Sequence, residues 1–209
     1  HTDNRRQRQM CIRDRGNGTQ DATYGTGLTS ASDLVITKST DTMSWYVWSS
    51  QLSSSNNYLK LESTVQAQTT YTPLYPTNPL SEGVGKFKIG NDEGVNSSSK
   101  DYVAYHFANQ SNYFKIGTYA GTDNATTAIT GVGFKPDIVV IKCIDGSSQW
   151  NVTDSVRGVT HPLEWNQSSA EQTRSDFVVS FDDNGFTVAG DDAVSDNGRN
   201  FIYIAWKIN

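Results

Sequence analysis

Cysteine, methionine and histidine are scarce in this chain, and each shortage excludes a class of protein. The 209 residues include two cysteines, two methionines and three histidines. Two cysteines cannot supply the disulfide framework of a small secreted protein, and no Cys or His spacing fits a structural zinc site. Apolar runs stay well short of the ~20 residues that a membrane helix needs. We therefore expect no metal, no cofactor and no membrane insertion.

Catalytic motifs are missing as well. The sequence has no G-x-S-x-G, no H-E-x-x-H and no phosphate-binding Walker loop. His106 lies in an apolar strand pattern and is expected to be a satisfied core or edge residue, whereas His161 precedes a proline in a loop. Cys143 sits in an apolar run, which is typical of a buried thiol. Spacing marks no carboxylate pair for glycoside hydrolysis. The sequence thus predicts no catalytic residues.

Arginine is rare outside one short stretch. Five of the eight arginines lie in residues 5–15, RRQRQMCIRDR. Such a stretch can be a basic arm that grips phosphate or an anionic membrane, or a disordered tail. However, MCIRD followed by arginine is also what one reading frame of a common sequencing-library adapter encodes. We therefore interpret residues 1–15 as an adapter-derived, non-native segment and exclude them from fold reasoning. This interpretation predicts that residues 1–15 pair poorly or not at all.

The rest of the chain is acidic. Without residues 1–15 it has 12 basic residues (17 − 5) and 20 acidic residues (22 − 2), a net charge of −8. A general nucleic-acid binder needs a basic face, so we expect no nucleic-acid partner.

Short apolar and aromatic runs alternate with Gly, Ser, Thr, Asn and Asp along the whole chain. Runs such as DLVITK, KFKIG, DIVVIKC, GFTVAG and NFIYIAW have the composition and length of strands, and no long helical period appears. Strands at this spacing favour an all-β sandwich or barrel.

The chain also repeats itself. Residues 33–38, DLVITK, match residues 137–142, DIVVIK, and residues 95–107 match residues 194–206 throughout. Two copies of one unit of about a hundred residues therefore follow each other, at 16–110 and 111–209. The second copy opens with YFKIGTYAG, and the matching strand of the first would lie where the adapter-like string stands. We predict two tandem antiparallel β-sandwich repeats, jelly-roll-like, the first lacking its opening strand.

Repetition separates scaffold from candidate site. Aromatic residues recur at three matched positions, which we assign to the core. These pairs are Trp45 with Trp150, Phe87 with Phe186, and Phe107 with Trp206. Trp48 and Trp165 have no aromatic partner in the other copy, so either could stack on a ligand such as a sugar ring, or pack locally.

Charged loops supply the remaining candidates. Arg157 in DSVRG follows Asp154 by three residues, which favours an ion pair that fixes a loop and leaves a binding role open. FDDNGF at 181–186 resembles a calcium loop but lacks the spaced ligands of an EF-hand, and Asn-Gly favours a hairpin turn there. GDDAVSDNGRN at 190–200 could likewise hold an ion. We assign no metal ligand in either loop.

The order of motifs GFKPDIVVIK, W, DSVRG, SFDDNGF and NFIYIAWK resembles a repeat of unknown function found in structural and tail-fibre-like proteins of marine bacteriophages. The second copy matches from Gly133 to Lys207. The first is looser, because it lacks DSVRG and the proline of the second copy, although YLKLESTVQA is also similar to the middle of such repeats. The resemblance implies an all-β virion component with no catalytic residues and no cofactor, from a metagenomic source.

We therefore expect a non-catalytic bacteriophage protein, a tail fibre or appendage with a host-contact role. Its partners would be other virion proteins and a host surface glycan or protein, with a homo-oligomer left open, and its location the virion. The alternatives are a lectin-like carbohydrate-binding module and, less favoured, a glycan-degrading enzyme. Candidate ligand-binding residues are Trp48, Trp165 and Arg157.

Overall fold

The computed structural model describes residues 9–54, 57–69 and 74–208, and within them the fold is all-β. Antiparallel strands form four sheets, and the described residues include one helix, the single turn α1 (Asp192–Ser195). No helix in these ranges has the length and apolar character to cross a bilayer. The chain divides into two compact units. Unit 1 holds the residues up to Lys60 and Gln68–Asn109, and unit 2 holds Leu61–Ala67 and Gln110–Asn209.

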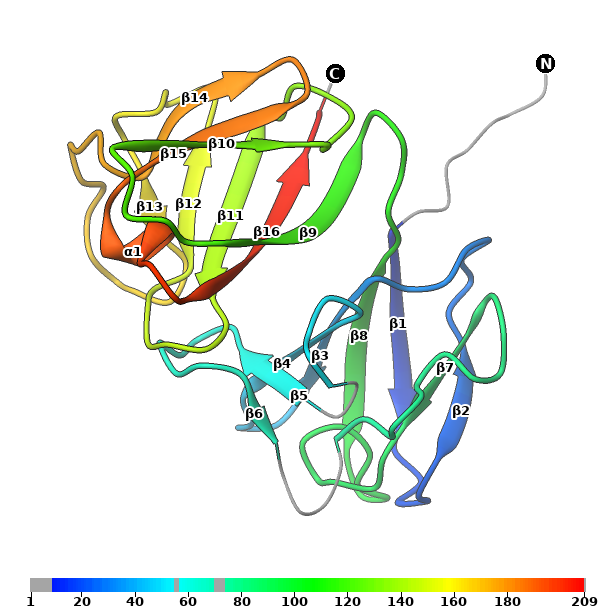
Figure 1. Ribbon diagram of the computed structural model, residues 1–209. Helices are drawn as coiled ribbons and strands as arrows, with labels where there is room; N and C mark the ends of the chain where they lie inside the picture. The colour runs from blue at the N-terminus through cyan, green and yellow to red at the C-terminus, as the bar shows by residue number, and fades with distance from the viewer. Residues whose placement is uncertain (1–8, 55–56, 70–73, 209) are drawn as a thin grey trace. The chain divides into compact units, whose positions relative to one another are not determined.

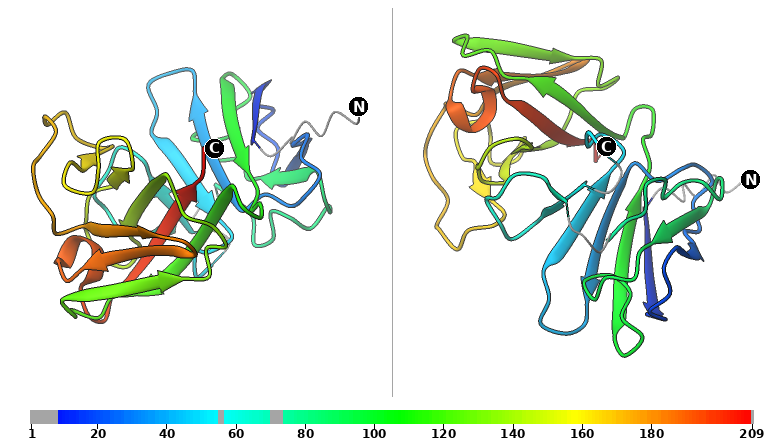
Figure 2. Two further views of the ribbon diagram at one scale, coloured as in Figure 1. Left: turned by 90° about the horizontal axis from the view of Figure 1, so that it is seen from above. Right: turned by 60° about the horizontal axis from the view of Figure 1, so that its bottom comes forward.

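Unit 2 is a sandwich of two antiparallel sheets. The order of its five-stranded sheet is β13 (Leu163–Glu164), β12 (Asn151–Asp154), β11 (Ile138–Cys143), β16 (Asn200–Trp206), β9 (Phe114–Ala120). The order of its three-stranded sheet is β10 (Thr126–Thr130), β15 (Gly185–Ala189), β14 (Val178–Asp182). Figures 1 and 2 show the smaller sheet lying across the larger one as a second layer.

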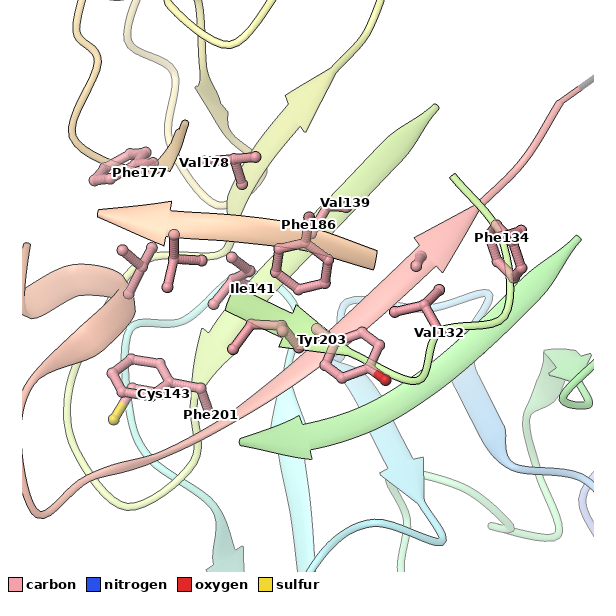
Figure 3. Close-up of a cluster of buried hydrophobic side chains, with 14 residues drawn as sticks. Val132, Phe134, Val139, Ile141, Cys143, Phe177, Val178, Phe186, Phe201 and Tyr203 are labelled. Carbon is pink, nitrogen blue, oxygen red and sulfur yellow. The ribbon is translucent and has the colours of Figure 1, made fainter. Parts of the chain in front are cut away.

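Side chains from both layers fill the core of unit 2 (Figure 3). Phe186 of β15 is fully buried, and its ring centroid lies 5.3 Å from that of Tyr203 on β16. Five consecutive residues of β16 are buried, so the strand is covered on both faces, as its continuous apolar pattern predicts. The Asn-Gly turn prediction also holds, because β14 and β15 form a hairpin in which Asp182 pairs with Gly185.

Unit 1 has the same layered plan. The order of its larger sheet is β1 (Gln9–Arg15), β8 (Asp101–Phe107), β3 (Leu34–Ser39), β4 (Trp45–Ser49), β5 (Asn57–Lys60), β6 (Gln68–Thr69). A second sheet pairs β2 (Ala22–Gly25) with β7 (Lys86–Ile89). Phe87, Trp48 and Tyr75 form the aromatic centre of the core, with ring centroids 5.2 Å to 6.4 Å apart.

The two units share one strand order. The row β1-β8-β3-β4-β5 corresponds to β9-β16-β11-β12-β13, and β2-β7 corresponds to β10-β15. Two glycines mark the same place in each unit. A Cβ on Gly16 would lie 2.2 Å from the carbonyl oxygen of Ser97, and a Cβ on Gly121 would lie 2.1 Å from that of Asp196. The chain can pass this close only where there is no side chain.

The prediction that unit 1 lacks its opening strand is wrong for this chain. Residues 9–15 form β1, which pairs with β8 from Gln9 opposite Phe107 to Arg15 opposite Asp101. Strand β1 occupies the place that β9 has beside β16. Backbone N–H and C=O groups at a sheet edge need partners, and a segment of almost any composition can supply them. The described side chains from Cys11 to Arg15 are nevertheless exposed or half-buried. Residues 1–8 lie outside the described residues.

The assignment of matched aromatics to the core is correct at some positions only. Phe87, Phe186 and Trp150 are buried, whereas Phe107 and Trp206 are half-buried. The assignment of Trp45 to the core is wrong, since its side chain is 36% exposed. The two matched tryptophans lie on the face of the larger sheet that points away from the smaller sheet, where Trp150 is 1% exposed and Trp45 is 36% exposed.

Candidate functional site

The long connection from β12 to β14, residues 155–177, carries two of the three predicted site residues. It contains only the two-residue strand β13, and loops of this length without secondary structure are commonly functional. Val156, at 91% exposure, projects from its first turn. We call residues 155–177 the long loop.

Arg157 fixes the start of the long loop. Its Nε donates to Asp154 Oδ2 at 2.6 Å, and its guanidinium lies 3.6 Å from a carboxylate oxygen of Glu171. Asp154 Oδ1 accepts the backbone N–H groups of Val156 and Arg157. Burial acts to raise the pKa of Asp154, but these hydrogen bonds and the guanidinium outweigh it and lower the pKa. The expected ion pair is therefore present, and it already engages the side chain of Arg157.

Arg174 fixes the end of the same loop. Its guanidinium donates to both carboxylate oxygens of Asp176 at 2.5 Å and 2.6 Å, and to Asp191 at 3.1 Å. It also lies 4.0 Å from the ring centroid of Phe177. The hydrogen bond that Arg174 donates to Asp176 is the main cause of its raised pKa. Two arginine clamps thus hold the ends of the loop, and both are paired with carboxylates of the protein.

Trp165 is the exposed aromatic residue of the long loop. Its side chain is 44% exposed, and its ring centroid lies 6.3 Å from that of Trp206. Its backbone N–H donates to the carbonyl of Trp150, so the chain is fixed where the indole leaves it. Residues 167–171 after it are also exposed. This segment offers an aromatic face beside amide and hydroxyl groups.

Trp48 does not belong with Trp165 and Arg157. It is 2% exposed and packs edge-on against Phe87 in the core of unit 1, so it has no ring face to offer a ligand. The sequence could not separate it from Trp45, because the difference is only the face of the strand on which each side chain falls. Arg157 and Trp165 lie in the same loop but have different partners: Arg157 pairs with Asp154, and Trp165 packs near Trp206.

Unit 1 contains a cavity that the sequence did not indicate. It has a volume of about 70 Å³ and lies between the two sheets, where Ile12, Asp14, Tyr24, Ala104 and other residues line it. Asp14 is the single carboxylate in its lining, so this cavity does not provide the carboxylate pair of a glycoside hydrolase.

His106 lies deep in unit 1 and is fully buried. Its Nε2 is 2.9 Å from the hydroxyl of Tyr24 and its Nδ1 is 2.9 Å from the hydroxyl of Ser32. Burial lowers the pKa of His106 to about 4. Both ring nitrogens have partners, which confirms the expected satisfied core histidine.

Cys143 and Lys142 end strand β11 in unit 2. Burial is the largest effect on the Cys143 thiol and raises its pKa, so the nucleophilic thiolate is disfavoured. Lys142 is fully buried, and burial lowers its pKa to about 8. Its ammonium donates to the carbonyl oxygens of Cys143 at 2.8 Å and Thr64 at 3.1 Å. Thr64 comes from Leu61–Ala67, the segment that follows β5 in the chain and belongs to unit 2.

An acidic cluster lies beside α1. Carboxylate oxygens of Asp123, Asp192 and Asp196 lie within 4.8 Å of one another, and all three residues are exposed or half-buried. Asp123 has a left-handed backbone, with φ of +54°, and accepts the N–H of Asn197. The sequence indicated an ion loop at 190–200 but gave no sign that Asp123 would join it.

Comparison with known proteins identifies a family for this chain. A family model described as "Domain of unknown function (DUF7483)" matches residues 11–207, nearly the whole chain. The match begins at Cys11, inside the segment interpreted as adapter-derived, and the origin of that segment stays a prediction. No curated protein and no solved structure matches the chain.

Proposed function

We propose that this chain, which belongs to the family described as a domain of unknown function (DUF7483), is a structural component of a bacteriophage virion. In this proposal it forms part of a tail fibre or appendage, contacts other virion proteins and the host surface, and catalyses no reaction. The resemblance of its motif order to phage structural repeats is the starting point.

Duplication of the sandwich is the observation that carries the proposal. Each of the two units, which share one strand order, supplies a β scaffold, while the loops between strands are free to vary and make contacts. The long loop of unit 2 fits a contact role, because its two arginine clamps hold it in place while Val156 and Trp165 stay exposed.

Two groups that could have served catalysis, His106 and Cys143, have structural environments, which also supports the proposal. His106 is held between two hydroxyl groups and its pKa is lowered to about 4, while the pKa of the buried Cys143 thiol is raised. A general base or nucleophile is expected to have a pKa shifted in the direction of its task. Neither shift suits catalysis near neutral pH.

Proteomics of natural marine samples tests the proposal. Water is separated into virus-sized particles and cells, and the tryptic peptide of residues 175–199, SDFVVSFDDNGFTVAGDDAVSDNGR, is quantified in each. We expect enrichment in the particles together with capsid peptides. Confinement of the peptide to cells or to the secreted soluble fraction would contradict a virion role and favour a carbohydrate-binding module or an enzyme.

A further inference from the structure

Because the two units share a strand order, residues in one have counterparts in the other. In unit 1 Val47 pairs with Leu59, and in unit 2 Val152 pairs with Leu163. Residues 61–67, which follow β5, therefore correspond to residues 165–171, which follow β13. We call residues 61–67 the first connecting segment and residues 165–171 the second connecting segment.

The first connecting segment is docked on unit 2. The Thr64 carbonyl oxygen accepts from Lys142 Nζ at 3.1 Å and from the Ser148 N–H at 3.0 Å. The Ala67 N–H donates to the Ile144 carbonyl at 2.9 Å. Leu61, Thr64 and Ala67 are half-buried. These are backbone contacts, so they depend little on which side chains the segment carries.

The described contacts of the second connecting segment are with its own unit: Asn166 Oδ1 accepts the Trp150 N–H at 2.9 Å, and Glu171 lies 3.6 Å from Arg157. Most of its side chains are nevertheless exposed to solvent. Trp165 and residues 167–171 are all exposed, in contrast to the half-buried counterparts at Leu61, Thr64 and Ala67. Trp165 stands at the position of Leu61, the first residue of the docked segment. An apolar side chain thus stands at the same place in both segments, half-buried at Leu61 and exposed at Trp165.

The surface that would receive the second connecting segment also exists in this chain. Lys38 and Trp45 of unit 1 correspond to Lys142 and Trp150 of unit 2 in strand register. Lys142 and Trp150 are 0% and 1% exposed, whereas Trp45 is 36% exposed and Lys38 is half-buried beneath it, 6.0 Å from its ring centroid.

Unit 1 shows what takes the place of the docking carbonyl. Lys38 Nζ and the Met43 N–H both donate to the carbonyl oxygen of Asp41, at 2.6 Å and 2.9 Å. In unit 2 the same two donors, Lys142 Nζ and the Ser148 N–H, are served by Thr64. The carbonyl of Asp41, in an exposed loop, therefore accepts the hydrogen bonds of both donors in unit 1. A segment that docked there would replace the Asp41 carbonyl with its own carbonyl as the acceptor.

We propose that copies of this chain associate head to tail, the second connecting segment of one copy docking on the Lys38–Trp45 surface of the next. Ser168, the counterpart of Thr64, supplies the carbonyl for Lys38 and Met43, and Trp165 is covered on docking. The two surfaces differ, so the interface is heterologous and generates chains or rings of copies. The proposal deepens the virion role, on which its biological meaning rests, by naming a second copy as partner.

The exchange of equivalent hydrogen bonds fixes the character of this association. Each donor keeps one acceptor, so the gain comes from covering the Trp165 and Trp45 side chains. Such an interface is small and forms at high local concentration, as in an assembling fibre, rather than in dilute solution.

A disulfide trap tests the proposal in the full chain. With Cys11→Ser as background, Met43→Cys and Ser168→Cys are combined and equilibrated at high protein concentration in a glutathione buffer. Thr64→Cys with Ser148→Cys, the equivalent pair within one chain, shows whether the geometry permits a bond. Met43→Cys with Ser111→Cys, which moves one thiol to another exposed serine of unit 2, is the matched negative control.

We expect a ladder of cross-linked oligomers from the Met43/Ser168 pair and only monomers from the control pair. Mixing the two single variants should stop at dimers, because each carries one half of the interface. Trp45→Ala, added to the pair, should weaken the ladder. A Met43/Ser168 ladder no stronger than the control, or dimers formed by Ser168→Cys alone, would overturn the proposal.

Polysaccharide binding is the competing use of Trp165. If Trp165→Ala abolished retention on immobilised dextran, agarose or galactomannan while Trp45→Ala did not, and the ladder was absent, the segment would bind glycans instead. The proteomic test of the virion role does not depend on either result, so the two proposals can fail separately.

Discussion

In unit 2 the ring of Tyr203 stands over Gly117 on the neighbouring strand, while the same two places in unit 1 hold Ala104 and Ile12. A Cβ on Gly117 would lie 2.5 Å from the Tyr203 hydroxyl, so the glycine makes room for the ring. In unit 1 the large residue is on the other strand, and a cavity of about 70 Å³ remains beside it. The same backbone arrangement thus accommodates a large residue on either of the two strands, opposite a small residue on the other. The two arrangements differ in how completely the side chains fill the core.

The neighbouring position repeats the contrast. Tyr119 of unit 2 stacks on Phe201 at 5.3 Å and donates its hydroxyl to the Val194 carbonyl, whereas its counterpart in unit 1 is the exposed Asp14 of β1. Strand β1 pairs with β8 through its backbone but does not fill the interior as β9 does. This is the expected behaviour of a segment that is held by backbone hydrogen bonds at a sheet edge and not by burial of its side chains in the core.

The largest effect should come from making unit 2 resemble unit 1. Tyr203→Ala removes a buried ring beside Phe186 and leaves space that Gly117 cannot fill, so unfolding should become easier by about 3–5 kcal/mol. Urea denaturation followed by circular dichroism measures the change. Tyr203→Phe is the control and should cost less than about 1.5 kcal/mol. A loss for Tyr203→Ala as small as that of the control would mean that the ring is not part of a closed core.

Acid should weaken unit 1 through a residue that unit 2 lacks, because the counterpart of His106 is Ala205. The folded-state pKa of His106, about 4, lies below its ordinary value of 6.5, so the unfolded chain binds the proton first. The contribution of His106 to the free energy of unfolding is therefore fully present above pH 6.5. It is lost as the pH falls toward 4, which lowers the free energy of unfolding by on the order of 3 kcal/mol.

Urea midpoints at pH 7.5, 5.5 and 4.5 measure this loss, with His106→Gln as the control that removes the titrating group. The variant should have a flatter pH dependence than the parent. Equal slopes for the two proteins would rule out His106 as the source.

The contrast between the two pairs can be tested by building the Tyr203–Gly117 arrangement of unit 2 into the equivalent positions of unit 1. Ala104→Tyr alone should destabilise unit 1 by about 1–3 kcal/mol, because the new ring meets Ile12. Adding Ile12→Gly recreates the Tyr203–Gly117 pair and should recover part of that loss, a coupling of about 1 kcal/mol or more. A double-mutant cycle in urea measures the coupling. Strict additivity would show that the side chains at positions 12 and 104 do not pack against each other.

The smallest effect concerns the start of the long loop. Asp154 corresponds to Ser49 of unit 1, whose hydroxyl accepts the Gln51 N–H as Asp154 accepts the Val156 N–H. Asp154→Ser keeps that turn bond and removes the partner of Arg157, so it should cost about 1–2 kcal/mol. Limited proteolysis at residues 155–177 should also accelerate. An unchanged cleavage rate in Asp154→Ser would show that the Asp154–Arg157 pair does not hold the loop.

The sequence by itself determined the class of fold and its duplication. Alternating and continuous apolar runs with turn residues between them allow only strands, and the match of residues 95–107 to 194–206 placed β8 and β16 at equivalent positions before any contact was known. The Asp154–Arg157 pair and the satisfied environment of His106 were also predicted, because local spacing and an apolar setting constrain both.

Only the tertiary structure decided which side chains are exposed to solvent, which are buried, and which backbone segments are paired. Trp45 and Trp48 lie three residues apart on one strand and fall on opposite faces, so the core position predicted for Trp45 belongs instead to Trp48, for which the sequence had left both packing and ligand binding open. Pairing of residues 9–15 depends on the unpaired edge of β8, which no property of that segment reveals. Docking of residues 61–67 on unit 2 uses the backbone carbonyl and N–H groups of that segment, so the side chains of the segment could not have shown it.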